Sequence, residues 1–137
     1  MLFRSILEIT ENATMGQPER TIEFMNQLRQ HGISFALDDF GAGLSSFAYL
    51  KSFNVDTLKI DGGFIRDITE NRISESMVAA ITQVAKVMEL STVAEYVETE
   101  ESWNLIKELG VDFAQGHFIS EPVTLDSVLA ELSKSGA

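Results

Sequence analysis

The sequence predicts an α/β protein with one parallel sheet of about five strands, and two observations support this prediction. The first is a set of five short apolar runs that each end in an acid, a lysine or a glutamine, as expected where a strand buried on both faces emerges from the core. These runs are LEITE (7–11), FALDDFG (35–41), DTLKID (56–61), VAEYVE (93–98) and FAQG (113–116). The second is that helical patterns separate most of them. Strict alternation implies right-handed crossovers and collects the polar groups at the carboxyl ends of the strands.

Apolar residues at helical spacing predict the helices in chain order. The first predicted helix covers 18–31, with Pro18 at its entry and Gly32 just past its end. Further helices are predicted over 74–89 and 102–109, and a last one around 125–132. In the helix over 74–89 the apolar face is expected to consist of Met77, Ile81, Val84 and Met88.

Composition and charge exclude several classes of function. The chain carries 10 basic and 21 acidic residues, a net charge of −11, so a nucleic-acid polymer is not an expected partner. The absence of cysteine removes disulfides, thiolate catalysis and cysteine-type zinc sites together. The two histidines are far apart in the sequence and make a poor metal cluster on their own, so we expect any metal to be held by oxygen. No membrane span or signal peptide is evident in the sequence, and we expect a cytoplasmic protein.

The acids at the ends of the runs are compatible with a small phosphate ester as ligand, provided that Mg²⁺ or Mn²⁺ bridges the phosphate to the carboxylates. Asp38 and Asp39 are adjacent, and successive strand residues point to opposite faces. Both can therefore face one site only if the strand ends between them, as the following Phe40 and Gly41 suggest. Lys59 and Asp61 are two residues apart, so an ion pair between them is one interpretation of that motif.

Five ordered blocks of this sequence resemble those of EAL domains, which are bacterial phosphodiesterases of the second messenger cyclic di-GMP. The blocks are LEITE, LDDFGAGLSSFAYL, VDTLKID, VAEYVETEE and FAQGHFISEP, and they extend from about residue 6 to about residue 124. The resemblance implies an incomplete TIM-like (β/α) barrel with about five parallel strands, each followed by a helix. It also implies metal-dependent hydrolysis of cyclic di-GMP to linear pGpG.

The resemblance implies roles for individual residues in metal binding. Glu8 matches a metal-binding glutamate, Asp38 matches the aspartate that bridges or binds the metals, and Asp39 matches a ligand of the second metal. Glu95 matches a metal-associated glutamate that we also expect to serve catalysis. Two divalent ions held by carboxylates can bind both the attacking and the leaving oxygen of a phosphodiester, which explains why the site uses these residue types.

Other positions match residues around the metals. Lys59 matches a lysine that contacts the attacking water, and Gln115 matches a residue that positions water or substrate. Such a lysine stays charged beside the acids, so we expect it to orient and polarise water rather than to act as a general base. The supporting acids are Glu11, Asp61 and Glu98.

The segment FGAGLSS matches a mobile loop that, in the family, couples dimer contacts to metal binding and that Glu11 would help to anchor. Its candidate functional positions are Phe40, Gly41, Gly43 and Ser46. Two glycines in such a loop could also bring the backbone close to a phosphate.

The sequence departs from the family pattern in several places. It begins at the LEITE strand, so residues 1–137 are expected to form a single partial EAL domain that lacks the N-terminal strands, the EAL glutamate and an asparagine ligand. Tyr96 stands where the family usually has glycine, and Gly62 and Gly63 stand where a basic residue and serine are common.

Two classes of function therefore stay open. The first is a cyclic di-GMP phosphodiesterase, impaired in this form; the second is a non-catalytic cyclic di-GMP receptor or protein-interaction module. Another acid-metal barrel, such as an enolase-like one, lacks the DDFG and KID blocks at these spacings. A complete (β/α)₈ barrel takes about 200 to 250 residues, so five units would leave an exposed parallel edge and favour a homo-oligomer.

Overall fold

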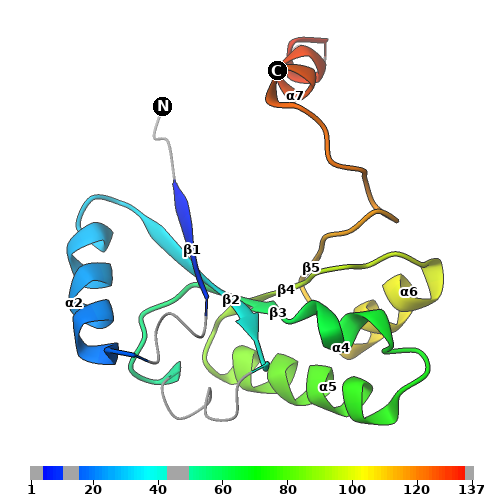
Figure 1. The fold of residues 1–137 in the computed structure, drawn as a ribbon, viewed down its shortest axis with the longest axis horizontal. Helices are drawn as coiled ribbons and strands as arrows, with labels where there is room; N and C mark the ends of the chain where they lie inside the picture. Colours follow the sequence, from blue (N-terminus) through cyan, green and yellow to red (C-terminus); the bar gives the residue numbers. More distant parts are fainter. Residues whose placement is uncertain (1–4, 11–15, 43–49, 135–137) are drawn as a thin grey trace.

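A parallel five-stranded sheet forms the centre of the structure, a computed structural model that describes residues 5–10, 16–42 and 50–134. Its strands are β1 (Ile6–Thr10), β2 (Ser34–Phe40), β3 (Thr57–Ile60), β4 (Ser91–Ala94) and β5 (Phe113–Ala114). They pair in the order β1-β2-β3-β4-β5, every pair parallel, so the predicted sheet is confirmed. Within the described ranges no pairing joins β1 to β5, and the sheet is open, with β3 at its centre (Figure 1).

Helices connect the strands. They are α2 (Pro18–Arg29), α4 (Gly62–Arg66), α5 (Arg72–Val87), α6 (Glu100–Leu109) and α7 (Leu125–Lys134). Four of them were predicted from periodicity, whereas α4 was missed because five residues are too few to show a helical period. In Figure 1, α2, α5 and α6 lie along one side of the sheet, and α7 stands apart from the rest.

The main core lies between the sheet and the helices α2, α5 and α6. Strands β2 and β3 and helix α5 contribute several of its largest fully buried side chains, which include Phe35, Phe40, Leu58, Ile60 and Ile81. The predicted face of α5 is confirmed for Ile81, which is buried, and for Val84 and Met88, which pack against the core, and the helix also buries Val78 and Ala85. The prediction considered large apolar residues only, whereas the small side chains of Ser74 and Ala85 are also buried on this helix.

Apolar side chains remain exposed at the edge strand and on the last helix. On β1, Ile6 and Leu7 are exposed, and every residue of α7 is exposed, including the apolar stripe that predicted this helix. That stripe consists of Leu125, Val128, Leu129 and Leu132. Such a face packs against something in most folded proteins. None of the described helices has the length and apolar character required to cross a membrane.

One buried polar group gives a prediction about stability. The Thr82 hydroxyl on α5 is buried and has no hydrogen-bond partner among the described residues. An unpaired buried polar group costs about 1–3 kcal/mol, so Thr82→Val, which replaces the hydroxyl by a methyl group, should raise the free energy of unfolding by about 1 kcal/mol. Urea denaturation measures this change. Thr82→Ser, which keeps the hydroxyl and loses a methyl group, should lower stability, and a less stable valine variant would contradict the prediction.

Candidate active site

The side chain of Lys59 lies at the centre of the candidate site. It projects from β3, is 8% exposed, and places its Nζ 2.7 Å from Glu8 Oε1 and 2.8 Å from Glu95 Oε1. Glu8 comes from β1, and Glu95 directly follows β4. One ammonium group therefore joins three segments of the sheet, because parallel strands present their carboxyl ends at the same edge.

The charges of this group are set by burial and by pairing. Burial by itself would lower the pKa of Lys59, but the hydrogen bonds to Glu8 and Glu95 outweigh that effect and raise it, so the amine stays protonated. Burial raises the pKa of Glu95, and the ammonium of Lys59 offsets only part of this rise. Lys59 is therefore a fixed positive charge and cannot accept a proton near neutral pH, as the sequence analysis expected.

A β-bulge in β2 brings Asp38 and Asp39 to the same region. Leu37 pairs with Leu58 and Phe40 pairs with Ile60, so two aspartates on β2 stand opposite the single Lys59 on β3. Asp39 adopts a left-handed backbone conformation, with φ 54°, and its N–H donates to Asp38 Oδ1 over 2.9 Å. The expectation that the strand ends between the two aspartates is wrong: β2 continues to Phe40, and the bulge supplies the change of direction.

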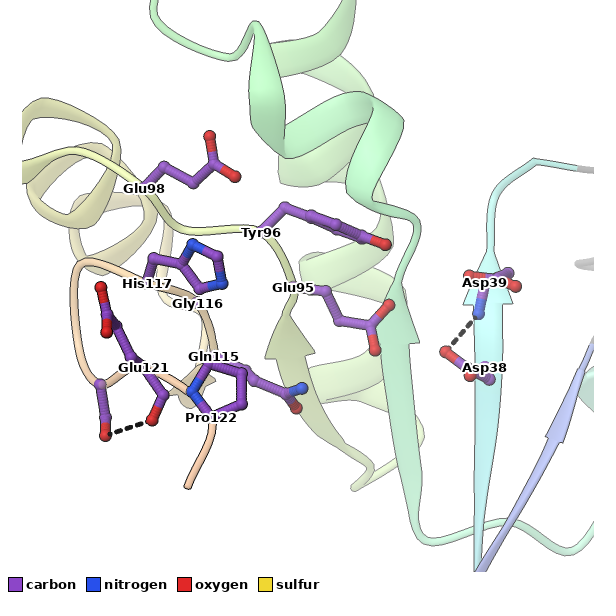
Figure 2. Close-up of a pocket in the computed structure, with 11 residues that line it drawn as sticks. Asp38, Asp39, Glu95, Tyr96, Glu98, Gln115, Gly116, His117, Glu121 and Pro122 are labelled. Atoms are coloured by element: carbon purple, nitrogen blue, oxygen red, sulfur yellow. Dashed lines mark hydrogen bonds between the residues drawn. The ribbon is translucent and has the colours of Figure 1, made fainter. Parts of the chain in front are cut away.

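Three carboxyl groups converge beside the lysine. Asp38, Asp39 and Glu95 each offer an oxygen within 4.8 Å of the others, and Figure 2 shows Glu95 extending toward the two aspartates. Desolvation and the neighbouring charge of Asp38 raise the pKa of Asp39. Anionic oxygens that are this close repel one another, and a hard divalent cation would relieve that repulsion.

These carboxylates form one side of a pocket whose other side follows β4 and β5. Gln115 comes directly after β5, and its backbone is fixed by hydrogen bonds to Ala94 and Val97. The pocket is also lined by Tyr96, Glu98, Gly116, His117, Ser120, Glu121 and Pro122. Figure 2 shows the Gln115 and His117 side chains on the side opposite Asp38 and Asp39.

Two of the predicted site residues, Asp61 and Phe40, have structural roles in the fold. Asp61 follows β3 and caps α4 by accepting a hydrogen bond from Gly63 N over 3.1 Å. The ion pairs that Lys59 makes among the described residues are with Glu8 and Glu95, so the Lys59–Asp61 pair considered from the sequence is not formed. Phe40 was expected in a functional loop, but it ends β2 and is buried in the core.

Gly41 follows β2 with φ 103°, in the left-handed region that favours glycine. The remaining predicted positions, Glu11, Gly43 and Ser46, lie outside the described residues.

Tyr96 and Gly62, two separate departures from the family pattern in the sequence, form a pair in the structure, which was not predicted. A Cβ atom on Gly62 would overlap the ring of Tyr96, so the ring occupies space that a larger residue would fill. Tyr96 itself has φ 60° and lines the pocket. The sequence did contain a signal for this pair: relative to the family pattern, a large side chain is gained at Tyr96 and one is lost at Gly62.

Comparisons with known proteins show which family and which structures this chain is similar to. Residues 3–122 match the family model of the EAL domain. The chain is 42% identical to the cyclic di-GMP phosphodiesterase PdeB of Shewanella oneidensis over 120 residues, which are 88% of this chain and 14% of that protein. It is 39% identical to the cyclic di-GMP phosphodiesterase PdeF of Escherichia coli over 127 residues, which are 93% of this chain and 17% of that protein. The chain thus spans less than a fifth of either relative.

Solved structures are similar over most of the chain. The EAL domain of DcpA from Mycobacterium smegmatis has 36% sequence identity and a TM-score of 0.86, covering 94% of this chain and 58% of that one. BlrP1 from Klebsiella pneumoniae, solved as a complex with manganese and cyclic di-GMP, has 32% identity and a TM-score of 0.77. This match covers 81% of this chain and 28% of that one.

The convergence of carboxylates predicts binding of a divalent cation. Asp39→Asn removes one anionic donor, so it should weaken Mn²⁺ binding by about tenfold or more, as measured by isothermal titration calorimetry. Asp126→Asn, on the exposed helix α7, is the matched control and should leave the affinity unchanged. Equal affinities for the wild type and the Asp39 variant would exclude Asp39 as a ligand.

The environment of Glu95 predicts a pH effect. Lys59→Met removes the charge that lowers the pKa of Glu95, so this pKa should rise further, as measured by carbon-detected NMR titration. A glutamate whose pKa is raised by folding binds more protons in the folded state, and stability falls as pH rises from the unfolded pKa to the folded one. The pH range over which stability falls should therefore extend to higher pH in Lys59→Met.

Lys59→Arg is the control for this titration, because it keeps a positive charge and should preserve most of the effect of the lysine on Glu95. An unchanged pKa of Glu95 in Lys59→Met would contradict the assignment of the ion pair.

Proposed function

Because this chain belongs to the EAL-domain family, we propose that it forms the active centre of a metal-dependent phosphodiesterase that hydrolyses cyclic di-GMP to linear pGpG. The observation that carries the proposal is the convergence of Asp38, Asp39 and Glu95 beside the buried ammonium of Lys59. The names of the relatives PdeB and PdeF support the substrate.

The donor set fits Mg²⁺ or Mn²⁺. Three carboxylate groups with oxygens within 4.8 Å of one another offer the hard donors that these ions prefer. Asp38, Asp39 and Glu95 would hold the metal, with Glu8 adjoining them through its ion pair with Lys59. When bound, such a metal stabilises the charge that develops on the phosphate oxygens and makes water a better nucleophile.

Each of the chain's own residues then has a distinct task. Lys59 is held by Glu8 and Glu95, stays protonated, and donates hydrogen bonds that orient the attacking water and polarise it. Gln115 lies across the pocket and positions water or substrate through its amide, and Glu98 is a supporting acid at the rim. Water adds to phosphorus, the P–O3′ bond breaks and the released 3′ oxygen takes up a proton, which opens the cyclic dinucleotide.

The exposed apolar surface supports a homo-oligomer. β1 is an edge strand with Ile6 and Leu7 exposed, and the apolar side chains of α7 are exposed as well. Burial of such surface against another copy removes apolar area from water and covers the outer edge of β1. The cytoplasmic location expected from the sequence stays a prediction.

Hydrolysis of cyclic di-GMP tests the proposed function directly. The purified chain with Mg²⁺ or Mn²⁺ should yield pGpG, identified by chromatography and mass spectrometry. Glu95→Gln should reduce turnover by about 100-fold or more, because it removes an anionic donor and a partner of Lys59 together.

Asp126→Asn should turn over like the wild type, and circular dichroism should show that both variants are folded. Binding of cyclic di-GMP without turnover would favour the receptor alternative. A folded chain that neither binds nor hydrolyses cyclic di-GMP would contradict the proposal.

A further inference from the structure

The aromatic ring of Tyr96 is held in place from one side and open to the pocket from another. Its contacts with Gly62 and Arg66 both come from α4: the ring occupies the space left by the missing side chain of Gly62, and the Arg66 guanidinium lies 4.1 Å from the ring centroid. Tyr96 nevertheless stays 46% exposed and lines the pocket that contains Asp38, Asp39 and Glu95. Figure 2 shows the ring above Glu95.

The backbone at Tyr96 indicates that this placement is not incidental. Its φ of 60° is a left-handed conformation that costs an aromatic residue energy, and such strain concentrates at functional sites. The cation–π contact with Arg66 and the packing on Gly62 are the interactions that hold the strained residue in one position. The ring is therefore a rigid surface in the wall of the pocket.

The pocket also needs a source of affinity other than charge. Its lining is acidic, with Asp38, Asp39, Glu95, Glu98 and Glu121, so an anionic ligand is attracted only where a cation intervenes. The uncharged part of the ligand can gain affinity from hydrogen bonds and from stacking on a neutral ring. Among the described residues that line the pocket, Tyr96 offers the one six-membered aromatic ring.

We propose that Tyr96 is a substrate-binding residue whose ring stacks against a purine base of the bound nucleotide. This inference rests on the proposed function, because it places the base of a phosphodiester whose phosphate lies at the carboxylates. Stacking of a base on an aromatic side chain needs a flat, exposed and preorganised ring beside the phosphate site, and Tyr96 provides it. Gly62 and Arg66 are positioning residues that act through Tyr96.

Two ligands distinguish binding of the base from binding of the phosphate. The affinity of the chain for GMP and for ribose 5-phosphate is measured by NMR titration in Mg²⁺. Tyr96→Asn keeps a residue that tolerates the left-handed conformation and removes the ring, so it should weaken GMP binding by about tenfold. Ribose 5-phosphate lacks a base, and its affinity should not change. Tyr96→Phe restores the ring and should recover most of the lost GMP affinity.

Phe24→Asn is the matched control, because it removes another exposed aromatic ring, on α2 and away from this pocket. It should bind GMP like the wild type. With cyclic di-GMP as substrate, Tyr96→Asn should raise KM about tenfold and change kcat by less than about threefold.

Equal GMP affinities in the wild type and Tyr96→Asn, together with a lower melting temperature of the variant, would overturn the inference and assign the ring a packing role only. If the wild type still hydrolyses cyclic di-GMP, that result leaves the proposed function standing. Absence of GMP binding to the wild type would also overturn the inference, whereas absence of both binding and hydrolysis of cyclic di-GMP would overturn the proposed function.

Discussion

The site depends on one constraint, which is that the buried ammonium of Lys59 must be neutralised. A charge this far from water is tolerated only when it is paired and hydrogen-bonded, and Glu8 and Glu95 meet both conditions. Because β1 and β3 are not neighbours in the sheet, the pair with Glu8 reaches across β2. The lysine therefore links the middle of β1 to β3 and to the residue that follows β4, and the acids that we propose to bind metal lie around it.

Two left-handed residues then shape the pocket. The bulge at Asp39 lets two consecutive aspartates reach one region, which a regular strand forbids. At Tyr96 the left-handed backbone carries the ring into the pocket wall, where α4 supports it. Both conformations are costly, and the surrounding contacts keep them in place. Strain of this kind in one pocket is consistent with selection for binding rather than for stability alone.

The local pattern of apolar and polar residues in the sequence was sufficient to predict most of the fold. The apolar runs predicted all five strands, and Gln115 was correctly placed at the end of the last one because its run ended there. The bulge, the cap that Asp61 makes and the burial of Phe40 were not predictable, since each depends on a neighbouring strand or helix. The Tyr96 and Gly62 pair is likewise a contact between segments far apart in the sequence.

The central claim is that Asp38, Asp39 and Glu95 form a metal site next to the Lys59 ammonium. Anomalous diffraction from crystals of the chain grown with Mn²⁺ and cyclic di-GMP tests it most directly. We expect manganese to be bound by oxygens of these three carboxylates, with a phosphate of the ligand beside Lys59. Manganese at other residues, or a ligand phosphate far from Lys59, would contradict the account.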